Sequence, residues 1–271
     1  MDEEASTFWL IHHILRKYLC THHNLFPRVQ LAMAETCLTY LNSDQSKALP
    51  AKPQPDLSSL PSPKYCSRYW GTHAERELSD HTRLLAIRLL DQFENHVAAN
   101  SLFEKVLDPG DSLEANAPLL FGGLHCASFF GIVDVMTDFL GTSGCDTNRG
   151  GSAGITLLAW AVRGGQDEAV ELLLGLEAAN LNKPDNKGRN PLTCTAIKGY
   201  EPVAKQLLDR EDVNPDKPDI KGIAPLSAAA ASGHQLILNQ LPNHEDVNPN
   251  KPDHKSRTPL TWLRLGGMNL W

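Results

Sequence analysis

A period of 34 residues runs through the second half of the chain and constrains its fold more than any other feature. Glycine and leucine each recur in phase over five copies, which chance does not explain. Because stacked units bury one another's apolar faces, such a period is typical of a solenoid. The glycines are Gly131, Gly165, Gly199, Gly233 and Gly267, and the leucines are Leu124, Leu158, Leu192, Leu226 and Leu260.

Each copy has the pattern turn, helix, turn, helix. Asn190-Pro191 and Thr258-Pro259 are typical helix starts, because a polar side chain caps the first turn and proline leaves no N–H unpaired there. The second helix carries apolar residues at helical spacing, as at Val135, Met136 and Phe139. Prolines in segment 212–219 exclude a helix and favour a hairpin-like turn. A second glycine series precedes the first helix, at Gly154, Gly188 and Gly222, with Ser256 in the last copy.

The order of these signals resembles the ankyrin repeat more than the tetratricopeptide repeat, whose aromatic signature is absent. The resemblance is carried by Thr-Pro-Leu at 258–260, by Leu-His-Cys-Ala at 124–127, and by Asp-Val-Asn followed by Asp-x-x-Gly at 212–222. It implies an all-α ankyrin solenoid over residues 109–271, with about five repeats. The histidine favoured in the first helix is kept only at His125; the other copies have Ala159, Thr193, Ser227 and Thr261.

The last repeat ends at Trp271, before its second helix. An unfinished end exposes core surface, because stacked repeats normally need polar caps. We therefore expect either a truncated chain or a missing partner, and self-association through this repeat.

Residues 1–108 read as a helical region without a repeat, and the prolines between about 42 and 63 predict an extended loop. Three phrases here, Phe8–Leu19, Glu35–Leu41 and Tyr65–Ala74, resemble the winged-helix and linker region that joins the NTPase to the ankyrin repeats in large fungal NACHT receptors. The polar sequence of Val247–Asp253, Val-Asn-Pro-Asn-Lys-Pro-Asp, also resembles this group of receptors, which belongs to the STAND, NLR-like proteins. The resemblance implies a small winged-helix-like region before the repeats.

The phosphate-binding loop of such receptors, GxxxxGK[ST], does not occur in the sequence. Nucleotide-driven switching is therefore not carried over from that family. Two interpretations remain open: a non-catalytic scaffold that binds a protein, or a fragment or in-trans subunit of a nucleotide-switched NACHT-type receptor.

The net charge of −7 disfavours nucleic acid as a partner, since a phosphate backbone binds clustered lysine and arginine. No uncharged apolar stretch approaches the length of a membrane span, and the acidic N-terminus is unlike a signal peptide. We therefore expect an intracellular protein, cytoplasmic or nuclear. The six cysteines form no CxxC pair and are predicted to be reduced and mostly buried.

Several short motifs resemble catalytic or metal-binding motifs but lack residues that those motifs require. Neither enzymatic activity nor a metal or cofactor is therefore expected. Gly150–Gly154 matches the GxSxG elbow around Ser152, but no strand precedes it. Asp212-x-Asn214-x-Asp216 begins like a calcium loop whose required glycine and glutamate are absent. The pairs His12-His13 and His22-His23 lack further metal ligands. A third hypothesis, a hydrolase using Ser152, is disfavoured on these grounds.

The ankyrin resemblance implies that hairpin tips and the exposed ends of the first helices form a concave binding surface. Trp160 and Trp262 lie on first helices and serve either as core or as aromatic anchors. The predicted partner-binding residues at the tips are Asn186, Lys187, Arg189, Ile220, Lys221, Ile223, His254 and Lys255, and those at the helix ends are Arg163, Ile197, Lys198, Ala231 and Ser232.

Overall fold

The computed structural model describes residues 29–47, 61–74, 78–91, 93, 96, 122–141, 145–151 and 154–267. The chain divides into two compact units, residues 1–108 and 109–271, each of which is considered by itself. Within the described ranges every regular element is a helix, which confirms the predicted all-α class. None of the helices described there is long and apolar enough to cross a bilayer.

The first unit contains helices α2 (Val29–Leu41), α3 (Asp44–Lys47), α4 (Pro61–Ala74) and α5 (Asp80–Asp91). Helix α2 packs against both α4 and α5. Apolar side chains from these helices, and Phe93 after them, are removed from water, which supplies the main stabilising free energy of the unit. The largest buried side chains here are Leu38, Leu41, Trp70, Leu89, Leu90 and Phe93.

The predicted loop over residues 42–63 is wrong at both ends. Residues 44–47 form α3, where the Ser43 hydroxyl accepts a hydrogen bond from the Ser46 N–H at 3.3 Å. Residues 61–63 open α4, because proline is tolerated in a first helical turn, whose N–H groups have no intrahelical partner. Residues 48–60 and the phrase at 8–19 lie outside the described residues, and the winged-helix resemblance stays a prediction.

Cys37 and Cys66 meet in the core of the first unit, where both are buried. Their thiols hydrogen bond to each other, which raises the pKa of Cys37 and lowers the pKa of Cys66. The five cysteines within the described ranges are free, and all of them except Cys145 are buried.

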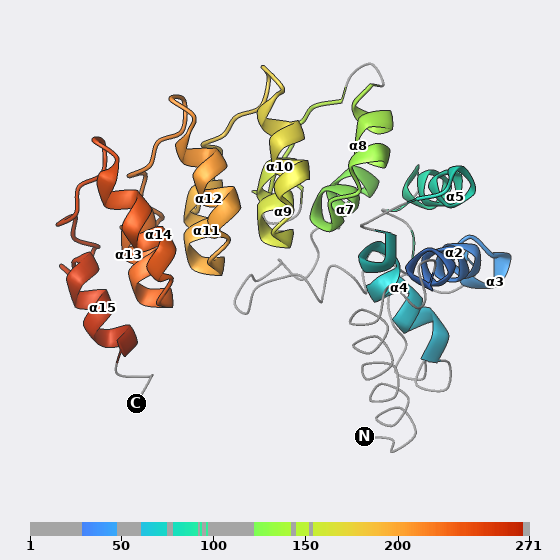
Figure 1. The fold of residues 1–271 in the computed structure, drawn as a ribbon, viewed down its shortest axis with the longest axis horizontal. Coiled ribbons are helices and arrows are strands. Elements are labelled where there is room, and N and C mark those ends of the chain that lie inside the picture. The colour runs from blue at the N-terminus through green and yellow to red at the C-terminus, as the bar shows by residue number, and fades with distance from the viewer. Residues whose placement is uncertain are drawn as a thin grey trace. The chain divides into compact units, whose positions relative to one another are not determined.

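The second unit is a row of helix pairs followed by one further helix (Figure 1). Each pair joins two short antiparallel helices, and a hairpin-like segment leads to the next pair. This is the arrangement of turns and helices that the 34-residue period predicts. The helices are α7 (Gly123–Phe130), α8 (Val133–Leu140), α9 (Leu157–Gly164), α10 (Asp167–Leu174), α11 (Pro191–Lys198), α12 (Glu201–Leu208), α13 (Pro225–Ser232), α14 (Gln235–Gln240), η4 (Leu241–Asn243) and α15 (Pro259–Gly267).

The ends of the first helices follow from local chemistry. The Asn190 side chain accepts a hydrogen bond from the Thr193 N–H at 2.7 Å, and Pro191 occupies the first turn of α11, as the sequence predicts. Gly165 and Gly199 end their helices with left-handed backbone. Side chains of the following repeat, Tyr200 and His234, lie against these glycines where a Cβ atom would stand. The periodic glycine therefore ends a helix and admits the next repeat.

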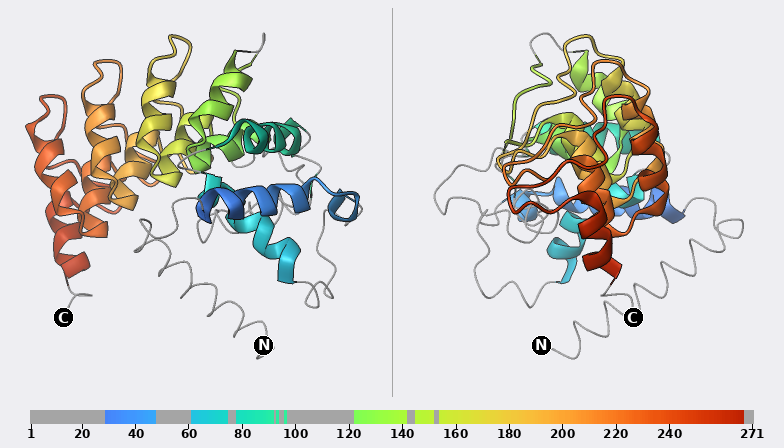
Figure 2. Two further views of the ribbon diagram at one scale, coloured as in Figure 1. Left: turned by 45° about the vertical axis from the view of Figure 1, so that its right-hand side comes forward. Right: turned by 90° about the vertical axis from the view of Figure 1, so that its left-hand side faces the viewer.

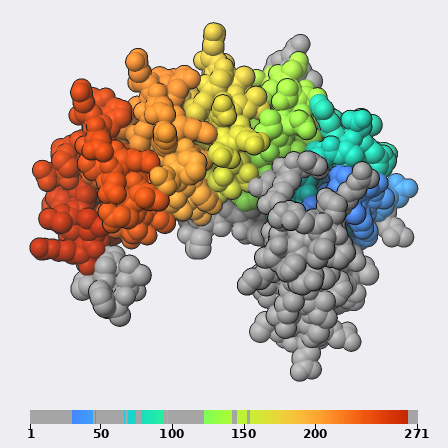
Figure 3. Space-filling model, in the orientation of Figure 1, coloured from blue at the N-terminus to red at the C-terminus, as the bar shows by residue number. Residues whose placement is uncertain are grey.

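The helices of the second unit form two layers (Figure 2). The first helices, α7, α9, α11, α13 and α15, pack closely against one another, whereas the second helices, α8, α10, α12 and α14, touch their neighbours less. In the space-filling view the repeats lie as successive bands from green to red (Figure 3). Because the first helices pack more closely, they lie on the inner, concave side of the array. The first helices and the hairpins together are called the inner face.

Trp160 on α9 belongs to the core, since its side chain is fully buried and its ring meets Phe129 edge to face at 6.1 Å. Trp262 on α15 is half-buried, and the Arg257 guanidinium lies 3.9 Å from its ring centroid. The two tryptophans thus differ: the first packs as core, and the second makes a cation–π contact at the edge of the stack.

His125 at the start of α7 makes stability depend on pH. Its Nδ1 accepts a hydrogen bond from the Gly122 N–H at 3.1 Å, so that nitrogen carries no proton. Burial lowers the pKa of His125 from 6.5 to about 4 and outweighs the hydrogen bond to the Arg149 backbone. Between these two values the unfolded chain binds the proton and the folded chain does not.

We therefore predict that the His125 contribution to stability is complete above pH 6.5 and is lost as the pH falls toward 4, to a total of about 3 kcal/mol. Urea unfolding at a series of pH values measures how the free energy of unfolding changes with pH. The variant His125→Asn keeps an acceptor in place of Nδ1 and should show a shallower decline over the same range. Equal slopes for the two proteins would contradict the assignment.

Candidate interaction surface

Three hairpins on the inner face are organised by one aspartate each. The Asp185 Oδ1 atom accepts hydrogen bonds from the N–H groups of Lys187 and Arg189, both at 2.9 Å. Asp219 and Asp253 do the same in their hairpins, with distances between 2.8 and 2.9 Å. A carboxylate that satisfies two backbone donors holds the turn in one conformation. The three hairpins are residues 185–189, 219–223 and 253–257.

Neighbouring hairpins are joined by main-chain hydrogen bonds. The Ile220 N–H donates to the Lys187 carbonyl at 3.1 Å, and the His254 N–H donates to the Lys221 carbonyl at 3.0 Å. Gly188 makes room for this contact, because a Cβ atom there would stand 2.7 Å from the Ile220 nitrogen. The tips are therefore fixed relative to one another from repeat to repeat.

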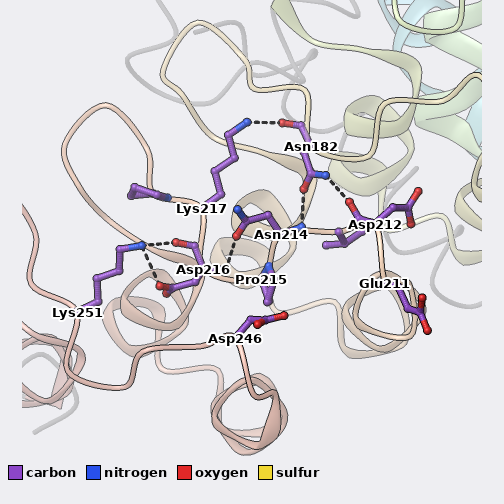
Figure 4. A pocket seen from close by; sticks show the side chains of 11 residues that line it. Asn182, Glu211, Asp212, Asn214, Pro215, Asp216, Lys217, Asp246 and Lys251 are labelled. Carbon is purple, nitrogen blue, oxygen red and sulfur yellow. Dashed lines mark hydrogen bonds and ion pairs between the residues drawn. The ribbon is translucent and has the colours of Figure 1, made fainter.

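Behind the hairpins, asparagine and lysine side chains tie each repeat to the one before it (Figure 4). The Asn182 Oδ1 atom accepts from the Asn214 N–H at 2.7 Å, and its Nδ2 donates to the Asp212 carbonyl. The Lys217 ammonium donates to the Asn182 carbonyl at 2.9 Å. Asn148 with Lys183 makes the equivalent contacts one repeat earlier. The polar segments thus serve as links between repeats.

A shallow cavity of about 710 Å³ opens beside these links and is lined by Asn182, by residues 211–218, and by Asp246 and Lys251 (Figure 4). Two of its acidic groups, Asp212 and Asp216, already have partners. A hydrogen bond from Arg210 lowers the pKa of Asp212, and Asp216 forms an ion pair with Lys251 at 2.9 Å. Asp212-x-Asn214-x-Asp216 is thus engaged in protein contacts. Across the described ranges no group of three acidic, cysteine or histidine side chains has the geometry to hold a metal ion.

Arg163 and Arg189 are not available for binding, which corrects the sequence-based prediction. Both are buried against Asp185: the Arg189 Nη2 atom lies 2.7 Å and the Arg163 Nη2 atom 3.3 Å from its Oδ2 atom. The Arg163 guanidinium also lies 5.7 Å from the centroid of the Trp160 ring. A carboxylate with two guanidinium partners offsets part of the cost of burying all three charges. These arginines stabilise the hairpin from inside.

The other two hairpins vary this arrangement. Arg257 reaches the Asp253 Oδ2 atom at 2.7 Å, and its hydrogen bonds with those of the neighbouring N–H groups outweigh burial and lower the pKa of Asp253. In the central hairpin Ile223 stands in place of the arginine, and Ile197 stands in place of Arg163. Asp219 therefore keeps the turn with isoleucine at both of the positions that arginine occupies around Asp185.

The remaining predicted binding residues divide into two classes. Ile220 is the most prominent, since 61% of it is exposed at the tip of the central hairpin. The exposed class is Asn186, Lys198, Ile220, Lys221, Ser232, His254 and Lys255, and the half-buried class is Lys187, Ile197, Ile223 and Ala231. The structure brings the tips into one row, and their role in partner binding stays a prediction. Ser152, His12-His13 and His22-His23 lie outside the described residues.

Comparison with known families supports the repeat assignment. Residues 124–219 match the family of ankyrin repeats in three copies. Residues 124–219 of this chain therefore carry ankyrin repeats. Helices α13, α14 and α15 continue the same register beyond the matched residues. The search of curated proteins gave no match.

Sequence reasoning missed the residues that link the ankyrin repeats. Lys183, Lys217 and Lys251 recur with the 34-residue period, and each donates to a carbonyl of the preceding repeat. The recurrence of these lysines with the period was the sequence signal that could have indicated them. Their partners are main-chain oxygens, which no residue pattern marks.

We predict that Asp185→Ala destabilises the array by about 3–5 kcal/mol, because it leaves two buried guanidinium groups without a carboxylate. Asp219→Ala is the matched control: it removes the same two turn hydrogen bonds, worth about 1 kcal/mol each, from a hairpin without an arginine. Chemical denaturation measures both. Equal losses in the two variants would show that the arginines add nothing.

Proposed function

We propose that the chain is a non-catalytic scaffold that binds a protein partner through the inner face of its ankyrin array. Ankyrin repeats in general imply protein partners. The observation that carries the proposal is the row of hairpin tips joined by the Ile220–Lys187 and His254–Lys221 main-chain hydrogen bonds. Because the tips are already ordered, a partner loses little free energy in organising them.

The exposed apolar groups on the inner face support the same function. Ile220 is exposed at the tip, Ile223 is half-buried in the same hairpin, and Ile197 is half-buried at the end of α11. Apolar anchors surrounded by polar groups are typical of the energetic centre of protein interfaces. The described part of the array thus offers an anchor site on a rigid frame.

The test uses peptides selected from a random display library against the wild-type chain. We expect Ile220→Asp to weaken their binding about tenfold or more, since it places a charge at the anchor position. Leu236→Asp is the matched control, because Leu236 is 57% exposed on α14 of the outer layer. Fluorescence anisotropy measures affinity for all three proteins.

If the selected peptides lose affinity for the Leu236 variant and keep it for the Ile220 variant, binding occurs on the outer layer and the proposal fails. Circular dichroism of each variant, compared with wild type, verifies that the array remains folded.

The alternative is that the same surface works inside a nucleotide-switched receptor of the NACHT type, to which the chain belongs as a fragment or an in-trans subunit. It is supported only by the sequence resemblance described above. An in-frame phosphate-binding loop upstream of Met1 in the full transcript would favour this alternative, because such a receptor binds ATP through that loop.

Self-association is a second binding mode, and the exposed leucines of α15 favour it. Leu260 is 63% exposed and Leu263 is 40% exposed. Burial of such leucines between two copies would contribute favourable free energy. We predict a concentration-dependent dimer in analytical ultracentrifugation that Leu260→Glu abolishes. A monomer at all concentrations for the wild-type chain would contradict this mode.

A further inference from the structure

Charge is divided between the two layers of the ankyrin array. The first helices α9, α11, α13 and α15 with the three hairpins carry eight basic and three acidic residues, while the second helices carry six acidic residues and one basic residue. The basic residues are Arg163, Lys187, Arg189, Lys198, Lys221, Lys255, Arg257 and Arg264. The acidic residues of the second helices are Asp134, Asp138, Asp167, Glu168, Glu171 and Glu201.

The positive charge of the inner face is presented by lysines, not by the paired arginines. Asp185 and Asp253 are taken up by their arginine partners, so two of the three acidic groups do not offset the lysines. Lys221 and Lys255 are exposed at the tips, and Lys187 is half-buried in the equivalent position of the preceding hairpin. A chain with a net charge of −7 thus carries a basic inner face.

Lys221 and Lys255, in equivalent positions of neighbouring repeats, lie at a spacing that an extended chain can match. Packed helices stand about 8–10 Å apart. An extended segment rises about 3.3 Å per residue, so three of its residues span about one repeat. Ile220 lies at the tip between Lys187 and Lys221, since its N–H donates to the Lys187 carbonyl, and Ile223 follows in the same hairpin.

We propose that the inner face binds an extended acidic segment of a partner protein, with a carboxylate at about every third residue and apolar side chains between. The carboxylates pair with Lys221 and Lys255, and an apolar side chain packs on Ile220. This inference rests on the proposed function, since it names the chemistry of the partner for the same surface. Complementary charge sets the register and the rate of association.

A protein fits this surface better than a nucleic acid does. Isoleucine side chains stand between the lysines, and the described tips carry no aromatic ring other than that of His254 on which bases could stack. The acidic second helices would repel a long phosphate backbone that extends past the inner face.

The experiment uses a labelled peptide of about twelve residues that repeats the triplet Asp-Val-Ser, titrated with the full chain in a fluorescence anisotropy assay. Lys221→Glu is compared with Lys205→Glu, which makes the same change of charge on α12 of the acidic layer. We expect Lys221→Glu to weaken binding about tenfold, since it replaces an attraction by a repulsion, and Lys205→Glu to change it less than about twofold.

Three results would overturn the inference: equal loss in the two variants, equal binding of a peptide with lysine in place of aspartate, or tighter binding of a single-stranded oligonucleotide than of the acidic peptide. Affinity that falls with added salt, together with the difference between the variants, supports it. If library peptides depend on Ile220 while this peptide does not bind, the acidic partner is wrong and the scaffold function stands.

Discussion

Burial of each helix pair against the next is the interaction on which the array depends. A pair of eight-residue helices such as α11 and α12 has apolar groups on more than one side, and only a neighbouring pair can cover them. Leu192, Val203 and Leu207 are fully buried because a repeat lies on each side. The period of the sequence is the consequence of this contact, since every repeat has to offer the same surfaces to the next one.

The hairpins depend on a second, local constraint. One aspartate in each satisfies two backbone N–H groups, so the turn has the same form whether its carboxylate also meets two arginines, one arginine or none. The conformation of the hairpin therefore does not depend on the charge of its last residue. The residue at 189, 223 or 257 can therefore differ between repeats while the tips remain in one row.

The division of charge follows from the same arrangement. The layer of second helices faces solvent with acidic side chains, and the layer of first helices ends in hairpins whose tips carry lysine. Because main-chain hydrogen bonds hold neighbouring tips together, the backbone positions from which these lysines extend form a fixed pattern. A surface of this kind discriminates partners by complementary charge as well as by shape.

The sequence by itself determined the repeat, the order of turns and helices and the residues of the apolar faces, because the period and the caps at Asn190 and Gly165 are local signals. It also placed Ile220 and Lys221 at a tip. It failed for the start of α4, where prolines read as a loop form the first turn of a helix. Only the tertiary structure decided that Arg163 and Arg189 are buried. Their shared partner, Asp185, lies in the same hairpin as Arg189 but in the repeat that follows Arg163. Two arginines that look like surface charges in a residue pattern become internal once the repeats stack, since burial is set by what lies opposite a side chain in space.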